Sequence, residues 1–437
     1  MALRFAQNTP NPSPQAEGGW RRGACPGLSA PMPTGDGLLV RVLPIGTIPL
    51  AAFGKLCAAA LEHGNGIVEI TARGSFQVRG LNAASAPRFA AAVAALGIAA
   101  QDGVPVLTNA LTGLDREEIF DAGALAADLR SALARGGLGA RLAPKISVAV
   151  DGGGALNLDA VSADVRLRAQ SINGGVALGV SVGGDGASAT RLGVVAPANA
   201  VEAVFRLLAV IAERGRDARA RDIVATEGIE PFRSAMGESG DPTLDSRLRG
   251  NDRREAIGLH TLRDGSLACG VGLPFGHADA ASLRELANAA GAAGSSGMRA
   301  ANARVLIAIA VAPGKAQAFV AAAERLGFIV RAEDPRRKVV ACAGAPVCAS
   351  AHIAARAMAP GIAAAAAAML SGASTIHLSG CAKGCAHPAP AALTVVGTSD
   401  GCALIVCGTA REAAFAVVPA DQLPAALAGA LRRGRHV

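Results

Sequence analysis

The sequence predicts an α+β fold made of two similar halves, related by a pseudo-two-fold axis. Each half joins a small sheet-and-helix lobe to a larger mixed α/β domain. At 437 residues the chain exceeds the size of one typical domain. Alternating and helical hydrophobic patterns follow one another along it. The Asp-Gly opening of residues 36–39 returns at residues 264–267, a spacing of roughly 230 residues, which is too long for a solenoid repeat and indicates a duplicated module.

The first lobe shows the order strand, helix, strand, strand, helix. Alternation predicts strands, helical periodicity predicts helices, and the glycines at 64–66 end the first helix. The expected elements are strands at 37–43, 67–73 and 75–79, and helices at 48–62 and 85–96. This order is typical of a ferredoxin-like half-domain.

The remaining boundaries follow from shifts in composition and from the repeated opening. Residues 237–258 are polar, of mixed charge and rich in glycine, which indicates a surface linker or insertion without a chemical role. The expected units are a disordered leader at 1–22, ferredoxin-like half-domains at 23–100 and 259–330, and α/β domains at 101–236 and 331–437, the last of which carries the cysteine motif.

Composition argues against several classes of function. Aromatic residues make up 3% of the chain, with no tyrosine and one tryptophan, so aromatic platforms for single-stranded nucleic acid are not expected. The net charge of +8 includes no long basic block, and apolar runs of membrane length are interrupted by charges or proline. We therefore expect neither nucleic acid nor membrane as a partner. Nine cysteines without an apolar signal segment indicate a reducing cytoplasm.

Four cysteines form the strongest motif. Cys342 and Cys348 make a C-x5-C pair, and Cys381 and Cys385 make a C-x3-C pair. Four thiolates are the usual ligands of a [4Fe–4S] cluster. Alanine and glycine beside each cysteine would let the backbone approach such a group and direct N–H groups to the sulfurs.

Three other interpretations of these cysteines are less favoured. Structural zinc sites use shorter C-x2–4-C loops than the first pair provides. A disulfide framework is unexpected in a long chain without a secretory signal. Burial in an alanine-rich core suits a single cysteine better than two tight pairs flanked by glycine. The remaining Cys25 and the His387 that follows the motif are ambiguous, while Cys402 and Cys407 suit packing roles.

The second pair lies in Ser379–Pro388, which resembles the cluster motif of the siroheme-dependent sulfite and nitrite reductase superfamily. Residues 22–41 resemble the opening of the precorrin-3B synthase branch of that superfamily, and the resemblance covers nearly the whole chain. In the reductases the last cysteine of the motif also bridges the cluster to the siroheme iron, and this resemblance would place that role on Cys385.

The same resemblance points to substrate-binding residues. Thr71-x-Arg73-x-x-x-Gln77-x-Arg79 is similar to a superfamily signature whose arginine faces the tetrapyrrole and its substrate. From the residues alone, this alternating row suits carboxylate binding, but a solvated strand face is favoured about two to one. Lys145 resembles the first lysine of an anion-binding strand. Ser147 stands in place of the second lysine, and Val104 in place of a reductase arginine, which weakens a sulfite or nitrite reductase assignment.

The resemblance implies an iron–sulfur oxidoreductase of cobalamin biosynthesis, a monooxygenase that hydroxylates precorrin-3A at C20 and forms a γ-lactone. Its substrate would bind through Arg73, Gln77, Arg79 and Lys145, with Arg73 and Lys145 at the catalytic centre. The four motif cysteines would hold the cluster that delivers electrons. Further requirements are O2, an unidentified electron donor and a non-haem iron, for which the sequence shows no ligand triad.

Two alternatives remain open. The first is a siroheme-dependent assimilatory sulfite or nitrite reductase, the one reading that requires retained siroheme. The second is a non-catalytic iron–sulfur carrier or sensor, for which the chain is larger than necessary and the cationic strands are unexplained.

Overall fold

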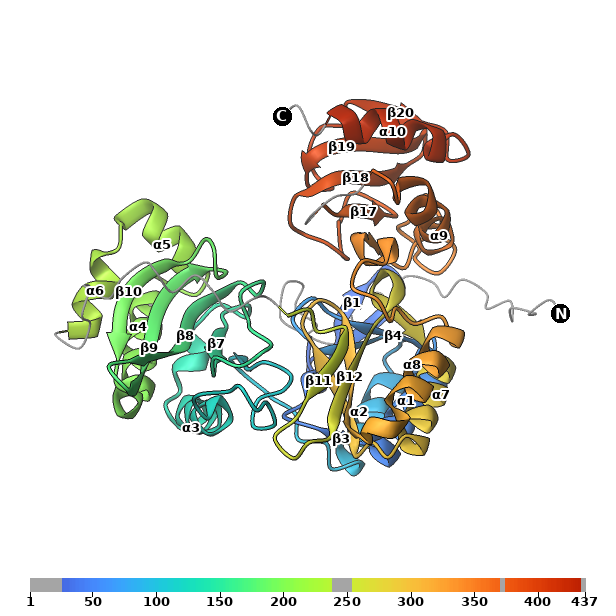
Figure 1. The fold of residues 1–437 in the computed structure, drawn as a ribbon. Coiled ribbons are helices and arrows are strands. Elements are labelled where there is room, and N and C mark those ends of the chain that lie inside the picture. Colours follow the sequence, from blue (N-terminus) through green and yellow to red (C-terminus); the bar gives the residue numbers. More distant parts are fainter. Residues whose placement is uncertain (1–25, 238–253, 370–373, 434–437) are drawn as a thin grey trace.

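The computed structural model describes residues 26–237, 254–369 and 374–433. The predicted leader at 1–22, Cys25 and most of the predicted linker lie outside the described residues. Figure 1 shows a central body, coloured blue and yellow, with a green lobe and an orange-to-red lobe attached to it. The described chain forms four five-stranded sheets, two in the central body and one in each lobe. The predicted α+β class is confirmed.

The two sheets of the central body exchange an edge strand between the halves of the chain. Their orders are β1-β2-β5-β4-β13 and β11-β12-β15-β14-β3. The first half supplies β1 (Met32–Thr34), β2 (Gly37–Val42), β3 (Ile48–Pro49), β4 (Ile67–Ile70) and β5 (Phe76–Leu81). The second half supplies β11 (Gly258–Thr261), β12 (Leu267–Gly272), β13 (His277–Asp279), β14 (Gly297–Ala301) and β15 (Val305–Val311). Local periodicity did not indicate the exchange, because β3 and β13 are too short to show a pattern.

One continuous core joins the halves. It contains buried side chains from the two sheets and from helices α1 (Leu50–His63), α2 (Ser85–Ala95), α7 (Ala280–Ala292) and α8 (Ala316–Arg325). Helices α1 and α7 follow the exchanged strands β3 and β13 directly. The strand exchange therefore carries each helix to the boundary between the halves, where α1 packs on α7.

The β4–β5 and β14–β15 hairpins meet tip to tip. Arg73 forms an isolated bridge with Asn302, and the Ala303 N–H donates to the Ala72 carbonyl at 3.0 Å. The strand predicted for residues 67–73 ends at Ile70, so Arg73 lies in the turn, outside the strand face that carries Gln77 and Arg79. The chain can turn there because Gly74 has a φ of +75°, which costs a residue without Cβ little.

The green lobe is the first α/β domain. Its sheet order is β10-β9-β8-β7-β6, in which β6, β7 and β8 are parallel and β9 and β10 are antiparallel. The strands are β6 (Val106–Leu107), β7 (Val148–Asp151), β8 (Ala163–Ile172), β9 (Gly175–Gly184) and β10 (Thr190–Val195). The helices are α3 (Ala122–Arg135), α4 (Ala200–Glu213), α5 (Ala220–Glu227) and α6 (Glu230–Met236).

The orange-to-red lobe, the second α/β domain, repeats this topology with sheet order β16-β17-β18-β19-β20. Its elements are β16 (Val339–Ala341), α9 (Ala355–Ala366), β17 (Ile376–Ser379), β18 (Ala391–Thr398), β19 (Gly401–Gly408), β20 (Ala416–Val418) and α10 (Leu423–Arg433). Helix α9 continues through Pro360, because proline removes a single backbone donor there and the buried alanine face continues past it.

Each α/β domain contacts the central sheet that the other half mainly builds. Ala110 and Leu111 of the first domain share a small core with Ile307 and Ile309 of β15. In the second domain, the Ala349 N–H donates to the Gly35 carbonyl at 2.9 Å. In the described parts of the chain, no helix has the length and apolar character needed to cross a membrane.

The contact of the hairpin tips predicts a specific cost for Gly74→Ala. A Cβ at Gly74 would lie 2.9 Å from the Ala301 carbonyl carbon, whereas a Cβ at Gly97, which also has positive φ, meets nothing within 4 Å. We expect Gly97→Ala to lower the free energy of unfolding by about 1 kcal/mol, and Gly74→Ala by about 1–3 kcal/mol more. Urea unfolding of both variants measures the difference. Equal losses would show that the tips do not constrain each other.

Candidate functional site

The two cysteine loops begin at the same edge of the second α/β sheet. Strands β16 and β17 are parallel neighbours, so the segments that follow them leave from adjacent positions. Cys342 directly follows β16, and its N–H donates to the Leu378 carbonyl at 3.1 Å. Gly380 directly follows β17, and its N–H donates to the Cys342 Sγ at 3.0 Å. This N–H···S contact joins the two loops before any ligand is bound.

Neighbouring thiols of the motif affect the ionisation of Cys342 and Cys385. Burial raises the pKa of Cys342, the Gly380 and Gly344 N–H groups lower it, and Cys385 and Cys348 raise it. Burial also raises the pKa of Cys385, where Arg79 opposes the effect and Cys381 and Cys348 add to it. Cys385 therefore lies within electrostatic range of the other three predicted cysteines.

The surroundings of the thiols leave room only for small residues. A Cβ on Gly35, from the central body, would lie 2.4 Å from the Cys348 Sγ. A Cβ on Gly380 would lie 2.6 Å from the Ala351 Cβ. Within the described chain, no group of three or more His, Cys, Asp or Glu side chains has the arrangement of a site for one metal ion. A single zinc ion, with zinc–sulfur bonds of about 2.3 Å, would hold its sulfur ligands within about 4 Å of one another.

A buried ion-pair network lies near the thiols, on the central sheet β1-β2-β5-β4-β13. Arg79 donates to both carboxylate oxygens of Asp36, at 2.8 and 2.9 Å, and its Nη1 lies 3.6 Å from Glu69. Arg356 of α9 pairs with the same Glu69 and so links the second α/β domain to this sheet. Burial lowers the pKa of Arg79, but Glu69 and Asp36 outweigh that effect and raise it, so the guanidinium stays charged.

Of the four predicted substrate-binding residues, Gln77, Arg79 and Lys145 lie outside the cleft described below. In the orientation that satisfies its amide, Gln77 donates to Glu69 at 3.1 Å and accepts from Arg41 at 3.0 Å. Arg79 is occupied by two carboxylates. Lys145 is exposed just before β7, where its carbonyl accepts from Arg219 at 3.3 Å. The predicted row of donors along one strand face is therefore not the arrangement observed.

Arg73, by contrast, lines a cleft of about 170 Å³ between the central body and the first α/β domain. The cleft lies at the carboxyl ends of β6 and β7, the edge equivalent to the one that carries the cysteines in the second domain. Its other polar and charged lining residues are Gln101, Thr108, Asn109, Thr112, Arg130, Arg299 and Asn302.

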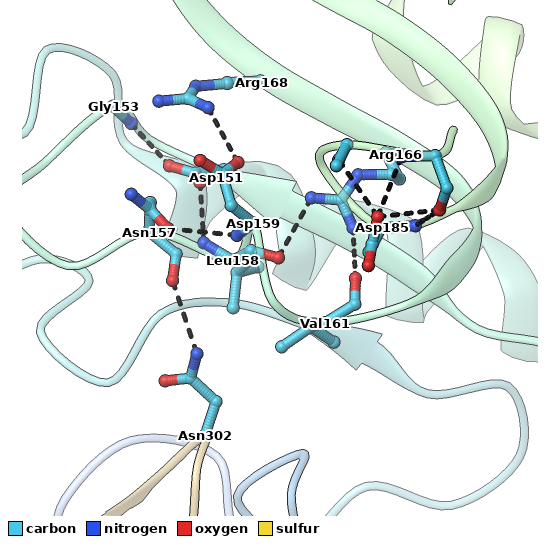
Figure 2. Close-up of polar contacts among 12 residues, drawn as sticks. Asp151, Gly153, Asn157, Leu158, Asp159, Val161, Arg166, Arg168, Asp185 and Asn302 are labelled. Carbon is cyan, nitrogen blue, oxygen red and sulfur yellow. Dashed lines mark hydrogen bonds and ion pairs between the residues drawn. The ribbon is translucent and has the colours of Figure 1, made fainter. Parts of the chain in front are cut away.

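A buried polar network holds the cleft wall that follows β7. Figure 2 shows Arg166 donating to the Leu158 carbonyl, at 3.0 Å, and to the Val161 carbonyl, while Asp151 accepts from the Leu158 N–H at 2.9 Å. Asn302 reaches this segment from the β14–β15 hairpin tip, 3.5 Å from the Asn157 carbonyl. Because Leu158 and Val161 line the cleft, these contacts set its shape.

Arg130 and Asn109 line the cleft but belong to none of the motifs recognised in the sequence. They come from α3 and from the segment after β6, far from the recognised motifs. Only the strand order could have indicated their position, because loops after adjacent parallel strands meet at one sheet edge. Near the thiols, the His387 ring packs on the buried His377 ring with centroids 5.7 Å apart. Cys402 is buried and Cys407 exposed, both on β19.

Comparison with known proteins gives consistent relatives. Residues 30–96 match the family described as nitrite/sulfite reductase ferredoxin-like half domain. A precorrin-3B synthase from Sinorhizobium sp is 39% identical over 419 residues, covering 95% of this chain and 89% of that protein. A ferredoxin–nitrite reductase from Synechococcus elongatus is 27% identical over 358 residues, covering 76% and 70%. The structure of Mycobacterium tuberculosis NirA superposes with a TM-score of 0.69 at 20% identity, covering 89% and 79%, and is similar in fold.

The Arg79–Asp36 pair predicts a pH-dependent loss of stability. Burial would raise the pKa of Asp36, but Arg79 lowers it below its usual 3.8. A carboxyl group whose pKa is lower in the folded than in the unfolded protein stabilises the fold at pH values above its unfolded pKa. This stabilisation is lost as the pH falls through the pKa of the folded protein. Asp36→Asn should therefore cost about 3 kcal/mol at pH 7 and progressively less below about pH 4. Urea unfolding from pH 7 to 3 measures this gap against wild type. A pH-independent gap would contradict the ion-pair explanation, and exposed Asp128→Asn serves as control.

Proposed function

The chain belongs to the precorrin-3B synthase family, and we propose that it converts precorrin-3A to precorrin-3B by oxygen-dependent hydroxylation at C20 with γ-lactone formation. The observation that carries this proposal is 39% identity to a precorrin-3B synthase across 95% of the chain. The convergence of the four thiols and the arginine-lined cleft support it independently, because an oxidoreductase acting on a polycarboxylate needs a redox group and cationic binding groups.

We propose that Cys342, Cys348, Cys381 and Cys385 hold a [4Fe–4S] cluster, which would supply electrons. Three observations support the fit: neighbouring thiols raise the pKa values of Cys342 and Cys385, glycines leave space beside the thiols, and the Gly380 N–H already points at a sulfur. N–H donors at thiolate sulfurs stabilise the negative charge that such ligands carry. The buried Arg79 beside Cys385 would add to that effect.

We propose that the substrate binds at the cleft that Arg73 lines, with its carboxylates toward the arginines. Residues of both central hairpin tips, among them Arg73 and Asn302, line this cleft. Arg79 lowers the pKa of Cys385, and contact with substrate stays a prediction for both Arg79 and Gln77. Contact with substrate also stays a prediction for Lys145, an exposed cation of the first α/β domain.

Further components follow from the family assignment. We propose O2 as co-substrate, an unidentified protein as electron donor, and a non-haem iron whose ligands are not assigned. We also propose that the protein works in the cytoplasm, since the eight described cysteines are all free thiols.

The second candidate is a siroheme-dependent sulfite or nitrite reductase, which the similarity to the Synechococcus nitrite reductase favours. Ser147 opposes it, because it stands where the reductases carry their second lysine and is fully buried, with a hydroxyl that has no partner in the described chain. A small oxyanion needs more concentrated positive charge than this position offers.

Anaerobic purification with iron, sulfide and siroheme analysis separates the two candidates. We expect a cluster without siroheme. We also expect O2-dependent conversion of precorrin-3A to a product that carries the C20 hydroxyl group and the γ-lactone, detected by mass spectrometry. Tightly bound siroheme together with sulfite or nitrite reduction would instead establish the reductase.

Replacing one motif cysteine tests the cluster assignment. Cys381→Ala should reduce iron and sulfide to background and abolish turnover, because three thiolates leave one iron without its ligand. Cys407→Ser, an exposed cysteine of the same domain, should keep wild-type iron and sulfide content. Unchanged iron and sulfide in Cys381→Ala would remove this residue from the ligand set.

A further inference from the structure

Besides Arg73, two arginines line the cleft, Arg130 and Arg299, and no aspartate or glutamate belongs to its lining in the described chain. Arg130, half-buried on α3, forms no hydrogen bond or ion pair that involves a described residue, and burial lowers its pKa. A half-buried guanidinium without a counter-ion is costly, and an anionic ligand would remove that cost.

Arg299 is the second cation and is held in position by neutral groups. Its Nε donates to the Thr47 hydroxyl at 2.7 Å, and its Nη1 donates to the Ala110 and Thr112 carbonyls at 3.0 Å each. Burial lowers the pKa of Arg299 to about 10, with an opposing contribution from Glu118, which is not in contact with it. Its other terminal nitrogen has no hydrogen-bond partner among the described residues, so it keeps donors available to the cleft.

Two buried polar atoms in the same lining also lack partners. Asn109 is 3% exposed, and its Oδ1 accepts from the Leu111 N–H at 2.8 Å, which fixes the side chain. Its Nδ2 and the Thr112 Oγ1 have no hydrogen bond in the described chain. Buried donors are normally satisfied, so these two point to a ligand that accepts hydrogen bonds.

The cleft, with a volume of about 170 Å³, has room for the carboxylate group of one acidic side arm beside these side chains.

We propose that Arg130, Arg299, Asn109 and Thr112 form a carboxylate-binding subsite that receives one acidic side arm of the tetrapyrrole substrate. The guanidinium groups neutralise the carboxylate, and the Asn109 amide and Thr112 hydroxyl donate to its oxygens. This inference rests on the proposed function and names residues of the same site. It explains how the enzyme would hold the macrocycle in one orientation, because a single arm is anchored in a pocket of limited volume.

The test is fluorescence titration of the anaerobically purified full chain with uroporphyrin III, an air-stable tetrapyrrole with eight carboxylates. Arg130→Ala should raise the dissociation constant about tenfold or more, since charged hydrogen bonds are the strong ones. Arg135→Ala, an exposed arginine at the end of the same helix, should leave it unchanged. Equal dissociation constants for Arg130→Ala and wild type would overturn the proposal.

Asn109→Asp provides a variant that a purely structural role would not explain. Aspartate keeps the oxygen that accepts from Leu111, but replaces the amide donor with negative charge facing the ligand. We expect weaker uroporphyrin binding than in Asn109→Ala, although Asn109→Asp keeps the acceptor for the Leu111 N–H that Asn109→Ala loses. Equal or tighter binding by Asn109→Asp would overturn the carboxylate assignment.

Turnover separates this inference from the proposed function. If wild type converts precorrin-3A and Arg130→Ala does so with an unchanged KM, the subsite is wrong and the function stands. If wild type binds uroporphyrin through Arg130 but does not convert precorrin-3A, the subsite stands and the proposed reaction is wrong.

Discussion

The exchange of β3 and β13 between the two central sheets is the constraint on which the other parts depend. Neither sheet has its full set of five strands without a strand from the other half of the chain. The exchange merges the helices of both halves into one core and brings the hairpin tips into contact at Arg73 and Asn302. Because each α/β domain then packs on the sheet of the opposite half, the positions of the cleft and of the cysteine loops follow from this central pairing.

The two α/β domains use equivalent sheet edges for different chemistry. In both, loops leave the carboxyl ends of two adjacent parallel strands, so side chains distant in sequence converge. In the second domain these loops present four thiols. In the first, a network around Asp151 and Arg166 shapes a wall of the cleft. The cluster and the carboxylate subsite that we propose would therefore use equivalent edges of the two domains.

Charge is distributed unequally between these two regions. Beside the thiols, Arg79 is neutralised by Asp36 and Glu69, and Arg356 binds the same Glu69. Such buried pairs are costly to break and hold the second domain against the central sheet. In the cleft, Arg130 has no such counter-ion among the described residues. The available attraction for a polycarboxylate therefore lies in the cleft, which supports the family's substrate class over a small oxyanion at the position of Ser147.

The sequence alone determined the α+β class and most helices and strands of the first ferredoxin-like lobe, and it predicted the four cluster cysteines, because hydrophobic period and ligand spacing are local properties of the chain. It also indicated Arg73, through its resemblance to a known signature. Only the tertiary structure decided that Gln77 and Arg79 face carboxylates of the protein, that Lys145 lies away from the cleft, and that Arg130 lines it. The physical reason is that strand exchange and ion pairing join residues far apart in sequence. A local pattern predicts whether a position is buried, but it does not predict which distant group contacts it.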